Sequence, residues 1–375
     1  MIEKNKTILL VGGGTGGHIV PILSLSQEFE NRGLSINVIT VGGNGPIDQK
    51  LYLGLKNHIA LKTGKLHRNI TLKNIIQLFL FFSGLISSFI ILKKLKPSLI
   101  FSKAGYVSFP IIFWSKIIGI PYFIHESDIE MGASNKFALS GAKKVFVGFP
   151  IKYYPKIQKN KLRYTGQILR PDILKPQEET FDFGFSNRKP IIFVTGGSQG
   201  STNINNAIFQ ILDKILPDYN VIHHTGSLDY ENAIEIRSRL ESDNKQSYYI
   251  SPLLTTIENG IDMMKSAILQ SDLVISRASA TTLAEVSMMK KPMIIVPYKY
   301  AASDHQTKNA NFYSENGAAV VISDDKLSGE TLKQKIDNLF LDSRKMKEIG
   351  QKAFELQNPN GLSTIVEEID KYLNN

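Results

Sequence analysis

The chain contains no cysteine. It therefore forms no disulfide, uses no thiolate nucleophile, and offers no cysteine ligands for a zinc-ribbon or iron–sulfur centre. A chain without cysteine fits a reducing compartment. The sequence also lacks the H-E-x-x-H pattern of zinc proteases. We expect no cleaved secretory signal, because the short apolar stretch near the start runs directly into glycines.

Two further absences narrow the nucleotide chemistry. Gly12, Gly14 and Gly17 match the G-x-G-x-x-G pattern between an apolar run and a helical stretch. A nicotinamide dinucleotide site also needs an acidic residue at the end of the second strand, and residues 40–43 (Thr-Val-Gly-Gly) contain none. No glycine run is followed by Lys-Ser or Lys-Thr, so there is no Walker loop. The glycines by themselves therefore favour neither a dehydrogenase nor a P-loop nucleotidase.

The composition is that of a globular protein with unevenly distributed charge. The chain has 375 residues, of which 42% are hydrophobic and 21% are charged, and this predicts two domains with sizeable cores. Residues 1–165 carry 22 lysines and arginines against 7 acidic residues, whereas the whole chain has 44 against 34. This asymmetry indicates an anionic partner, either nucleic acid or anionic lipid. The alternative is a generally basic surface, as in a lysine-rich proteome.

Short apolar runs alternate with helical stretches along the chain, which predicts parallel sheets built from β-α-β units. The segment TILLVGGGTGG at 7–17 has a counterpart in PIIFVTGGSQG at 190–200, each an apolar strand followed by a glycine-rich turn. This repeat predicts an α/β fold of two Rossmann-like domains, with a linker at 164–190 and a last helix at 363–373. The expected strands are residues 7–11, 35–41, 99–102, 121–125, 144–147, 190–195, 219–224, 272–276, 292–297 and 318–322.

Both glycine-rich turns are suited to phosphate. Backbone N–H groups at the start of a helix bind anions well, and the hydroxyl of Ser198 lies within the second turn. Two such turns suit a nucleotide-sugar donor and a phosphorylated acceptor. The structural alternative is that the glycines only allow tight packing between strand and helix.

Eight blocks along the chain resemble the MurG type of glycosyltransferase, which transfers N-acetylglucosamine from its uridine diphosphate donor to a lipid-linked muramyl peptide. In order, they are GGGTGGHIVP (12–21), KAGYVSFP (103–110), HESD (125–128), TGQILR (165–170), GGSQGS (196–201), HHTG (223–226), SRASATTLAE (276–285) and DHQTKNA (304–310). The blocks cover nearly the whole chain in the family's order. The resemblance implies a GT-B fold, in which two Rossmann-like domains face each other across a cleft.

The same resemblance assigns functions to the parts of the chain. It implies an acceptor- and membrane-facing domain at 1–165 and a UDP-GlcNAc-binding domain at 166–357. It also implies that a helix at 358–375 returns to the first domain.

The resemblance further implies roles for individual residues. Thr15, Gly16 and Gly17 match the family's contact to the acceptor and the sugar, and Asp128 stands where the family usually has an asparagine that contacts the donor sugar. The residues that match other donor contacts are Arg170 and Ser198 for the diphosphate, Ile261 for uracil, Ala280, Thr281, Thr282, Leu283 and Ala284 for the nucleotide loop, Glu285 for the ribose, and Gln306 for a sugar hydroxyl. These side chains suit the roles, because a carboxylate accepts hydrogen bonds from a vicinal diol and a guanidinium clamps phosphate oxygens. Ser279 replaces a usual glycine in the nucleotide loop, where its side chain could crowd the donor phosphates.

A sugar hydroxyl that attacks the donor must lose its proton to a base. Histidine is the side chain whose pKa lies near neutrality. His18 follows the turn that is expected to face the acceptor, so we predict His18 as the base, with His125 and Glu126 as the second choice. Alternatively, His18 only orients the acceptor, and Asp128 or a water molecule takes the proton. No metal or cofactor is expected, since the nearest approach to a D-x-D pair is residues 128–130 (Asp-Ile-Glu).

One segment, IIQLFLFFSGLISSFIIL at 75–92, is long and uncharged, and Lys93, Lys94 and Lys96 follow it. Its length is at the lower edge of what spans a membrane. A spanning helix would place the motif blocks on opposite sides of a bilayer, so we do not expect one. Two interpretations remain: a helix buried in the core, or a helix partly exposed at an anionic membrane surface that attracts the lysines.

We therefore predict an inverting hexosyltransferase that is peripheral to the cytoplasmic face of the plasma membrane. Its expected partners are UDP-N-acetylglucosamine, an undecaprenyl-diphosphate-linked muramyl peptide and an anionic membrane surface. The sequence has no recognised nucleic-acid-binding motif, so no nucleic-acid partner is expected. The alternatives are another GT-B enzyme, such as a diacylglycerol glycosyltransferase or a nucleotide-sugar epimerase, and a non-catalytic binding module of the same fold.

Overall fold

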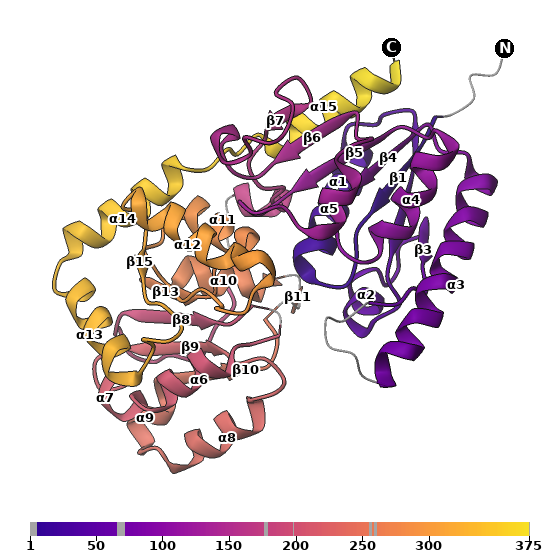
Figure 1. Ribbon diagram of the computed structural model, residues 1–375. Helices are drawn as coiled ribbons and strands as arrows, with labels where there is room; N and C mark the ends of the chain where they lie inside the picture. The colour runs from indigo at the N-terminus through magenta and orange to yellow at the C-terminus, as the bar shows by residue number, and fades with distance from the viewer. Residues whose placement is uncertain are drawn as a thin grey trace. The chain divides into compact units, whose positions relative to one another are not determined.

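The computed structural model describes residues 6–65, 72–175, 179–197, 199–254, 257–258 and 261–374. It divides the chain into two compact units (Figure 1). Unit 1 comprises Met1–Pro171 and Asn358–Asn375, and unit 2 comprises Asp172–Gln357. The divide falls a few residues beyond the boundary expected from the sequence.

Unit 1 is built on a parallel sheet. Its described strands are β1 (Lys6–Val11), β2 (Ile36–Gly42), β3 (His58–Ala60), β4 (Leu99–Ser102), β5 (Tyr122–Glu126), β6 (Lys144–Val147) and β7 (Leu162–Tyr164), in the order β3-β2-β1-β4-β5-β6-β7. Neighbouring strands all run parallel. β4 and β5 are buried along their whole length, which explains their continuous apolar runs.

The helices of unit 1 include the last helix of the chain. They are α1 (Gly16–Asn31), α2 (Pro46–Leu51), α3 (Leu72–Leu95), α4 (Ser108–Ile118), α5 (Ala133–Ala138) and α15 (Gly361–Asn374), with a short 3-10 helix η1 (Ile151–Tyr153). Ile365 and Ile369 of α15 belong to the same buried cluster as Phe29 of α1. The ring of Tyr372 meets that of Phe123 edge to face, with 5.0 Å between the centroids. The end of the chain therefore completes the core of unit 1.

Unit 2 is also built on a parallel sheet. Its described parallel sheet has the order β10-β9-β8-β13-β14-β15, and a small antiparallel pair joins β11 to β12. The strands are β8 (Ile191–Thr195), β9 (Asn220–His224), β10 (Tyr248–Ser251), β11 (Ile257–Glu258), β12 (Ile261–Asp262), β13 (Leu273–Ser276), β14 (Met293–Ile295) and β15 (Val320–Val321). The helices are α6 (Thr202–Phe209), α7 (Leu212–Ile215), α8 (Tyr230–Arg239), α9 (Ser242–Gln246), α10 (Met263–Gln270), α11 (Ala280–Met288), α12 (His305–Glu315), α13 (Gly329–Phe340) and α14 (Ser343–Glu355), with the 3-10 helices η2 (Pro171–Leu174) at the divide and η3 (Ala302–Asp304).

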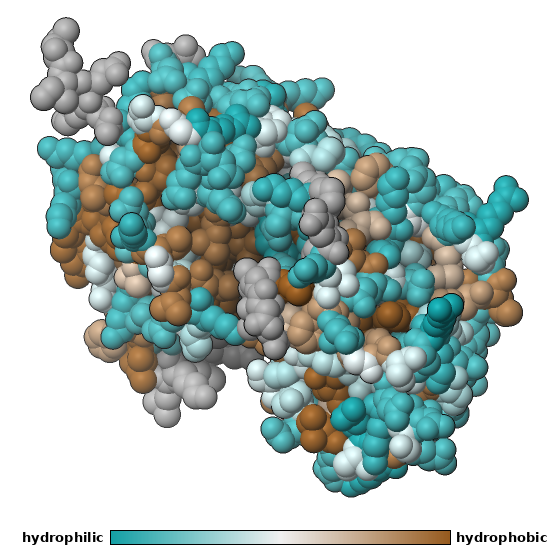
Figure 2. All heavy atoms as spheres, turned by 180° about the vertical axis from the view of Figure 1, so that it is seen from behind, coloured by the Kyte–Doolittle hydropathy of each residue, from teal (hydrophilic) through white to brown (hydrophobic). Residues whose placement is uncertain are grey.

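Helix α3 is not the buried core helix that one interpretation of the sequence expected. Its stretch Ile75–Leu95 is long and apolar enough to cross a membrane, and only 17% of its apolar window is buried. Phe79 is 74% exposed and Ile86 is 64% exposed. The other side of the helix packs on α4, where the Trp114 indole donates to the Leu85 carbonyl at 2.8 Å. Helix α3 lies at the right of Figure 1, and Figure 2, which shows the molecule from behind, has apolar surface along the corresponding left edge. The interpretation as a buried helix is therefore wrong.

Candidate functional site

The carboxyl ends of β1, β4 and β5 form one edge of the unit 1 sheet. The three strands are neighbours, and the strand order changes direction between β1 and β4. In doubly wound sheets, ligands bind at this point, outside the carboxyl ends of the strands. The first glycine-rich turn follows β1, Lys103 follows β4, and Asp128 comes shortly after β5. Three of the sequence blocks therefore meet at one edge.

The first glycine-rich turn leads directly into α1. Thr15 has an extended backbone at the N-cap, and its carbonyl accepts the N–H groups of His18 and Ile19 at 3.0 and 3.1 Å. The first turn of α1 contains no acidic residue, so no carboxylate of the helix itself offsets the positive end of its dipole. Thr15, Gly16 and Gly17 are each partly exposed. The residues that the resemblance assigns to the acceptor thus lie at an accessible helix N-terminus.

A pocket of about 460 Å³ lies against this turn. Lys62 and Lys65 line it and are both exposed, and Gln77 and Leu80 contribute a wall from α3. The backbone N–H of Lys65 donates to the Gln77 side-chain oxygen at 2.8 Å, so α3 holds the segment that carries the lysines. The pocket combines a helix N-terminus with two ammonium groups, and this combination suits a phosphate or diphosphate.

His18 is the third residue of α1 and lines this pocket. Burial and the nearby Lys103 ammonium lower the pKa of His18 to about 4, although the Asp128 carboxylate opposes the shift. The ring is therefore neutral at neutral pH. Its Nδ1 is buried and has no hydrogen-bond partner among the described residues. A neutral imidazole in a pocket is able to accept a proton.

Lys103 is a buried cation near His18. Its side chain is 1% exposed, and its ammonium group donates to the Ser127 hydroxyl. Burial lowers the pKa of Lys103 to about 8, although the Glu126 and Asp128 carboxylates oppose the shift. Glu126 is buried and accepts the backbone N–H of Asp128 at 3.0 Å. The edge of the sheet thus brings the Lys103 ammonium and the Asp128 carboxylate close to the imidazole, and the Glu126 carboxyl close to Lys103.

The alternative base, His125, lies inside the sheet. It belongs to β5, has no exposed surface, and its Nε2 meets the Gly166 carbonyl at 3.1 Å. Burial and the Lys103 charge hold the pKa of His125 far below its usual value. This histidine is placed to support the strand, whereas His18 lines the pocket. Asp128 is half-buried at the edge of the sheet, and its carbonyl accepts the Tyr154 hydroxyl at 2.8 Å.

Unit 2 carries the second glycine-rich turn between β8 and α6. The strand order changes direction between β8 and β13, so this turn also lies where a doubly wound sheet binds ligands. The Thr195 hydroxyl accepts the Gly197 N–H at 3.1 Å and lies 3.1 Å from His224 Nδ1, which fixes the turn to β9. Ser198, which the resemblance assigns to the diphosphate, lies outside the described residues.

Helix α11 carries the six residues that the resemblance assigns to the nucleotide loop and ribose. Ser279 precedes the helix as its N-cap, and its hydroxyl lies 3.3 Å from that of Thr281. Those that are buried are Ala280, Leu283 and Ala284. Those that are half-buried are Thr281, Thr282 and Glu285.

The remaining donor residues lie on other elements. Ile261 is a half-buried residue of β12. Gln306 is the second residue of α12, and its Oε1 accepts the Tyr298 N–H at 2.9 Å, which holds the preceding loop. Arg170 belongs to unit 1, just before the divide.

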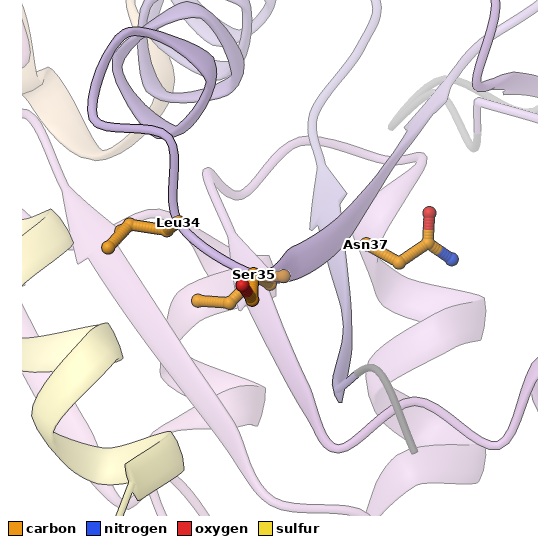
Figure 3. A pocket seen from close by; sticks show the side chains of 4 residues that line it. Leu34, Ser35 and Asn37 are labelled. Atoms are coloured by element: carbon orange, nitrogen blue, oxygen red, sulfur yellow. The ribbon is translucent and has the colours of Figure 1, made fainter. Parts of the chain in front are cut away.

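A second hollow, of about 470 Å³, lies at the amino end of β2 and is lined by residues 34–37. Figure 3 shows the side chains of Leu34 and Asn37 pointing in opposite directions. Asn37 donates to the Thr7 hydroxyl at 3.3 Å. No charged side chain lines this hollow, and it lies at the end of the sheet opposite the glycine-rich turn. It therefore contributes no candidate site.

Two family models match most of the chain. The model of the glycosyltransferase family 28 N-terminal domain matches residues 8–147, and that of the C-terminal domain matches residues 191–365. The UDP-N-acetylglucosamine--N-acetylmuramyl-(pentapeptide) pyrophosphoryl-undecaprenol N-acetylglucosamine transferase of Desulforamulus reducens is 32% identical over 372 residues, which cover 97% of this chain and 98% of the relative. The transferase of the same name from Clostridium perfringens is 34% identical over an alignment of 382 positions, which covers 98% of this chain and 99% of the relative. The chain belongs to glycosyltransferase family 28.

Solved structures resemble this family 28 member over their full length. MurG of Acinetobacter baumannii has a TM-score of 0.70 and 24% identity, covering 98% of this chain and 99% of that one. A UDP-GlcNAc 2-epimerase of Neisseria meningitidis, bound to UDP-GlcNAc, has a TM-score of 0.66 and 13% identity, covering 97% and 100%. The prediction of a GT-B fold built from two Rossmann-like units is confirmed. Transferases and epimerases both have this fold, so the fold by itself does not distinguish the two activities.

The sequence does not point to several residues of this candidate site. Lys62 and Lys65 lie outside the eight sequence blocks, and Lys103 belongs to the block at 103–110 without a role that the resemblance assigns. Asp48, which lines the pocket, was not singled out. The signal for Lys103 was its place directly after a buried strand, where a charged residue is unusual unless it has a partner. For Asp48 no local pattern separates it from a surface carboxylate.

Proposed function

We propose that this family 28 glycosyltransferase moves N-acetylglucosamine from UDP-N-acetylglucosamine to an N-acetylmuramyl peptide linked through a diphosphate to undecaprenol. The observation that carries the proposal is the match, over nearly the whole chain, to relatives named for this reaction. The two glycine-rich turns support it. Each turn follows a strand, β1 or β8, at the point where the strand order of its sheet reverses. The reaction has one nucleotide diphosphate and one lipid diphosphate to bind, so each turn has a diphosphate to receive.

The acceptor is assigned to the pocket of unit 1. The start of α1, Lys62 and Lys65 bind its diphosphate. Neutral His18 takes the proton of the acceptor hydroxyl as that oxygen attacks the anomeric carbon of the donor sugar. The bond between the anomeric carbon and the donor diphosphate breaks, and UDP leaves. A single displacement of this kind inverts the anomeric configuration.

The donor is assigned to unit 2. The half-buried Glu285 accepts hydrogen bonds from the ribose hydroxyls, and Ile261 packs on the uracil ring. Gln306, held by the Tyr298 N–H, meets a hydroxyl of the sugar. The second glycine-rich turn offers its backbone N–H groups to the diphosphate.

The release of UDP from a mixture of donor and acceptor tests the function. We expect UDP to appear only when UDP-N-acetylglucosamine and the lipid-linked muramyl peptide are both present, and in equal amount with the disaccharide product. Loss of donor without any acceptor would identify an epimerase. Release of UDP with diacylglycerol instead would identify a lipid glycosyltransferase, and no turnover with either acceptor would leave a binding module.

We further propose that the enzyme is peripheral to the cytoplasmic face of the membrane and docks there through α3. Phe79 and Ile86 present apolar surface, and exposed Lys93 and Lys94 follow at the end of the same helix. Such a helix lies well at an anionic interface. Gln77 of α3 also lines the pocket, so a helix on the lipid surface would bring the pocket to the level of the acceptor's diphosphate.

The wild-type protein is expected to bind vesicles that contain phosphatidylglycerol, and added salt should weaken this binding by screening surface charge. Changing Lys93, Lys94 and Lys96 to glutamate should weaken it further. A matched control changes Arg344, Lys345 and Lys347 of α14 to glutamate, which alters the net charge equally but lies in unit 2. Flotation of vesicles measures both variants. Equal losses, or binding that salt does not affect, would contradict docking through α3.

A further inference from the structure

Asp48 joins the loops that follow β1 and β2. It is the third residue of α2 and is 2% exposed. Its Oδ1 accepts the backbone N–H of Gly43 at 2.7 Å and that of Gly14 at 3.0 Å, and its Oδ2 lies 3.2 Å from the same Gly14 nitrogen. One carboxylate therefore ties the first glycine-rich turn to the neighbouring loop.

The glycines on both sides allow this close approach. A Cβ atom at position 13 would lie 2.6 Å from Asp48 Oδ1, and one at position 43 would lie 2.9 Å from it. Both distances are far below van der Waals contact, so any side chain there would push the carboxylate away. The residues Gly13 and Gly43 are thus needed for the carboxylate as well as for the turn.

The rear of the turn is held by Tyr52. Its hydroxyl donates to the Gly12 carbonyl at 2.7 Å, and its ring stacks on His58 with 4.0 Å between the centroids. Asp48 and Tyr52 lie one helical turn apart, and together they engage an N–H and a carbonyl of the same glycine-rich turn. The turn is fixed by side chains from α2 and the residue that follows it, not by its own sequence alone.

A carboxylate is an unexpected neighbour for an anion site. Asp48 lines the same pocket as Lys62 and Lys65, and its charge opposes the binding of an anion close to it. Because it also uses the Gly14 N–H, that group is not offered to a ligand. An anion in this pocket is therefore directed toward the start of α1 and the two lysines.

We propose that Asp48 is a positioning residue for the acceptor: it fixes the glycine-rich turn so that the start of α1 and His18 face the pocket, and it confines the acceptor's diphosphate to the lysine side. The proposal rests on the proposed function, because it takes the pocket to be the acceptor site. It assigns Asp48 no contact with the reacting atoms.

Kinetics of Asp48→Ala and Asp48→Asn test this role. Alanine leaves two buried N–H groups without a partner, and we expect the acceptor KM to rise about 10- to 100-fold while the KM for UDP-N-acetylglucosamine stays within about twofold. Asparagine can place its oxygen where Oδ1 lies and keep both short hydrogen bonds, so its acceptor KM should rise much less. The proposal would be overturned if Asp48→Ala raised the KM of the donor as much as that of the acceptor. It would also be overturned if Asp48→Asn raised the acceptor KM as much as Asp48→Ala.

A matched control separates positioning from general stability. Asp342 accepts the Lys345 N–H at 2.9 Å as the N-cap of α14 in unit 2. Asp342→Ala removes an exposed carboxylate that accepts one backbone N–H, and it should lower the thermal midpoint without changing the acceptor KM. A rise in acceptor KM for this control as large as that for Asp48→Ala would assign the effect to stability and overturn the proposal.

Hydrogen exchange provides a readout that needs no turnover. Asp48→Ala should speed amide exchange in the peptide that spans residues 12–18 and leave the peptide that spans 190–197 unchanged. If wild-type protein released no UDP with the lipid-linked acceptor, the proposed function would fail, yet this measurement would still show whether Asp48 holds the turn. Unchanged exchange at 12–18 in a folded variant would overturn the positioning role itself.

Discussion

His18→Ala is expected to lower the turnover number by roughly 10²- to 10⁴-fold, which is the usual contribution of a positioned general base, and to leave the affinity for the donor nearly unchanged. The reason is local. His18 lines the pocket of unit 1, whereas the residues assigned to the uracil and the ribose belong to unit 2. Its ring is neutral at the pH of the assay and can take the hydroxyl proton. Steady-state rates with both substrates, together with titration of UDP, measure the two effects separately.

The same histidine predicts a pH dependence. For the free enzyme, the acid limb of kcat/KM should lie near the pKa of His18, which burial and Lys103 lower to about 4. In kcat this limb should lie at higher pH, because the phosphate charge of the bound acceptor raises the pKa of the imidazole.

The stability of the folded protein should also depend on pH through His18. The pKa of His18 is 6.5 in the unfolded chain and about 4 in the folded protein. Between these values the unfolded chain binds a proton that the folded protein does not, so the free energy of unfolding falls as pH decreases from 6.5 toward about 4.

Two variants distinguish a base from a residue that only fills space. His18→Gln keeps a polar side chain of similar reach but supplies no base, so its turnover should fall nearly as far as that of the alanine variant. His125→Asn alters a histidine buried in β5 and should mainly lower stability. Near-normal turnover of His18→Ala across pH 6–9 would contradict the assignment. The search would then move to Asp128, tested as Asp128→Asn.

The central strands of both sheets could be predicted because burial on both faces leaves a continuous apolar run. Residues 99–102 and 144–147 were predicted with the bounds that β4 and β6 have. The sequence does not predict the edge strands β3, β7 and β10, although the fourth edge strand, β15, lies within the predicted 318–322. β3 and β7 have only three residues each, and β7 includes an exposed Arg163. An edge strand buries only part of its surface, so its sequence carries little of the pattern that marks a strand.

The candidate site was predicted in part, and the limit has a physical cause. The glycine-rich turns and His18 belong to contiguous blocks, so the sequence displays them directly. Asp48 and Lys103 act through contacts between loops that are far apart in the chain, and neither burial nor charge pairing of this kind is visible locally. Helix α3 illustrates the same limit, because composition gives its length and polarity but not which of its faces is covered.

Glu285→Ala is expected to weaken the binding of UDP by about 10²- to 10⁴-fold. Its carboxylate is assigned two charge-assisted hydrogen bonds to the ribose diol, each worth roughly 1.5–3 kcal/mol, and each 1.4 kcal/mol corresponds to about a factor of ten in Kd. Glu285 lies half-buried on α11, which begins directly after the loop that follows β13. Calorimetric titration of UDP into the variant measures the loss. Glu315→Ala, at the exposed end of α12, is the matched control and should bind UDP normally.

A ribose analogue decides whether Glu285 itself holds the diol. Wild-type protein should bind 2′-deoxy-UDP about tenfold or more weakly than UDP, because one charge-assisted hydrogen bond is lost. In Glu285→Ala that bond is already absent, so the two nucleotides should bind almost equally. The four affinities form a cycle in which the coupling belongs to the carboxylate and the hydroxyl alone. If the variant still discriminated against 2′-deoxy-UDP as strongly as the wild type, another residue would hold the 2′-hydroxyl, and the assignment of the ribose diol to Glu285 would be wrong.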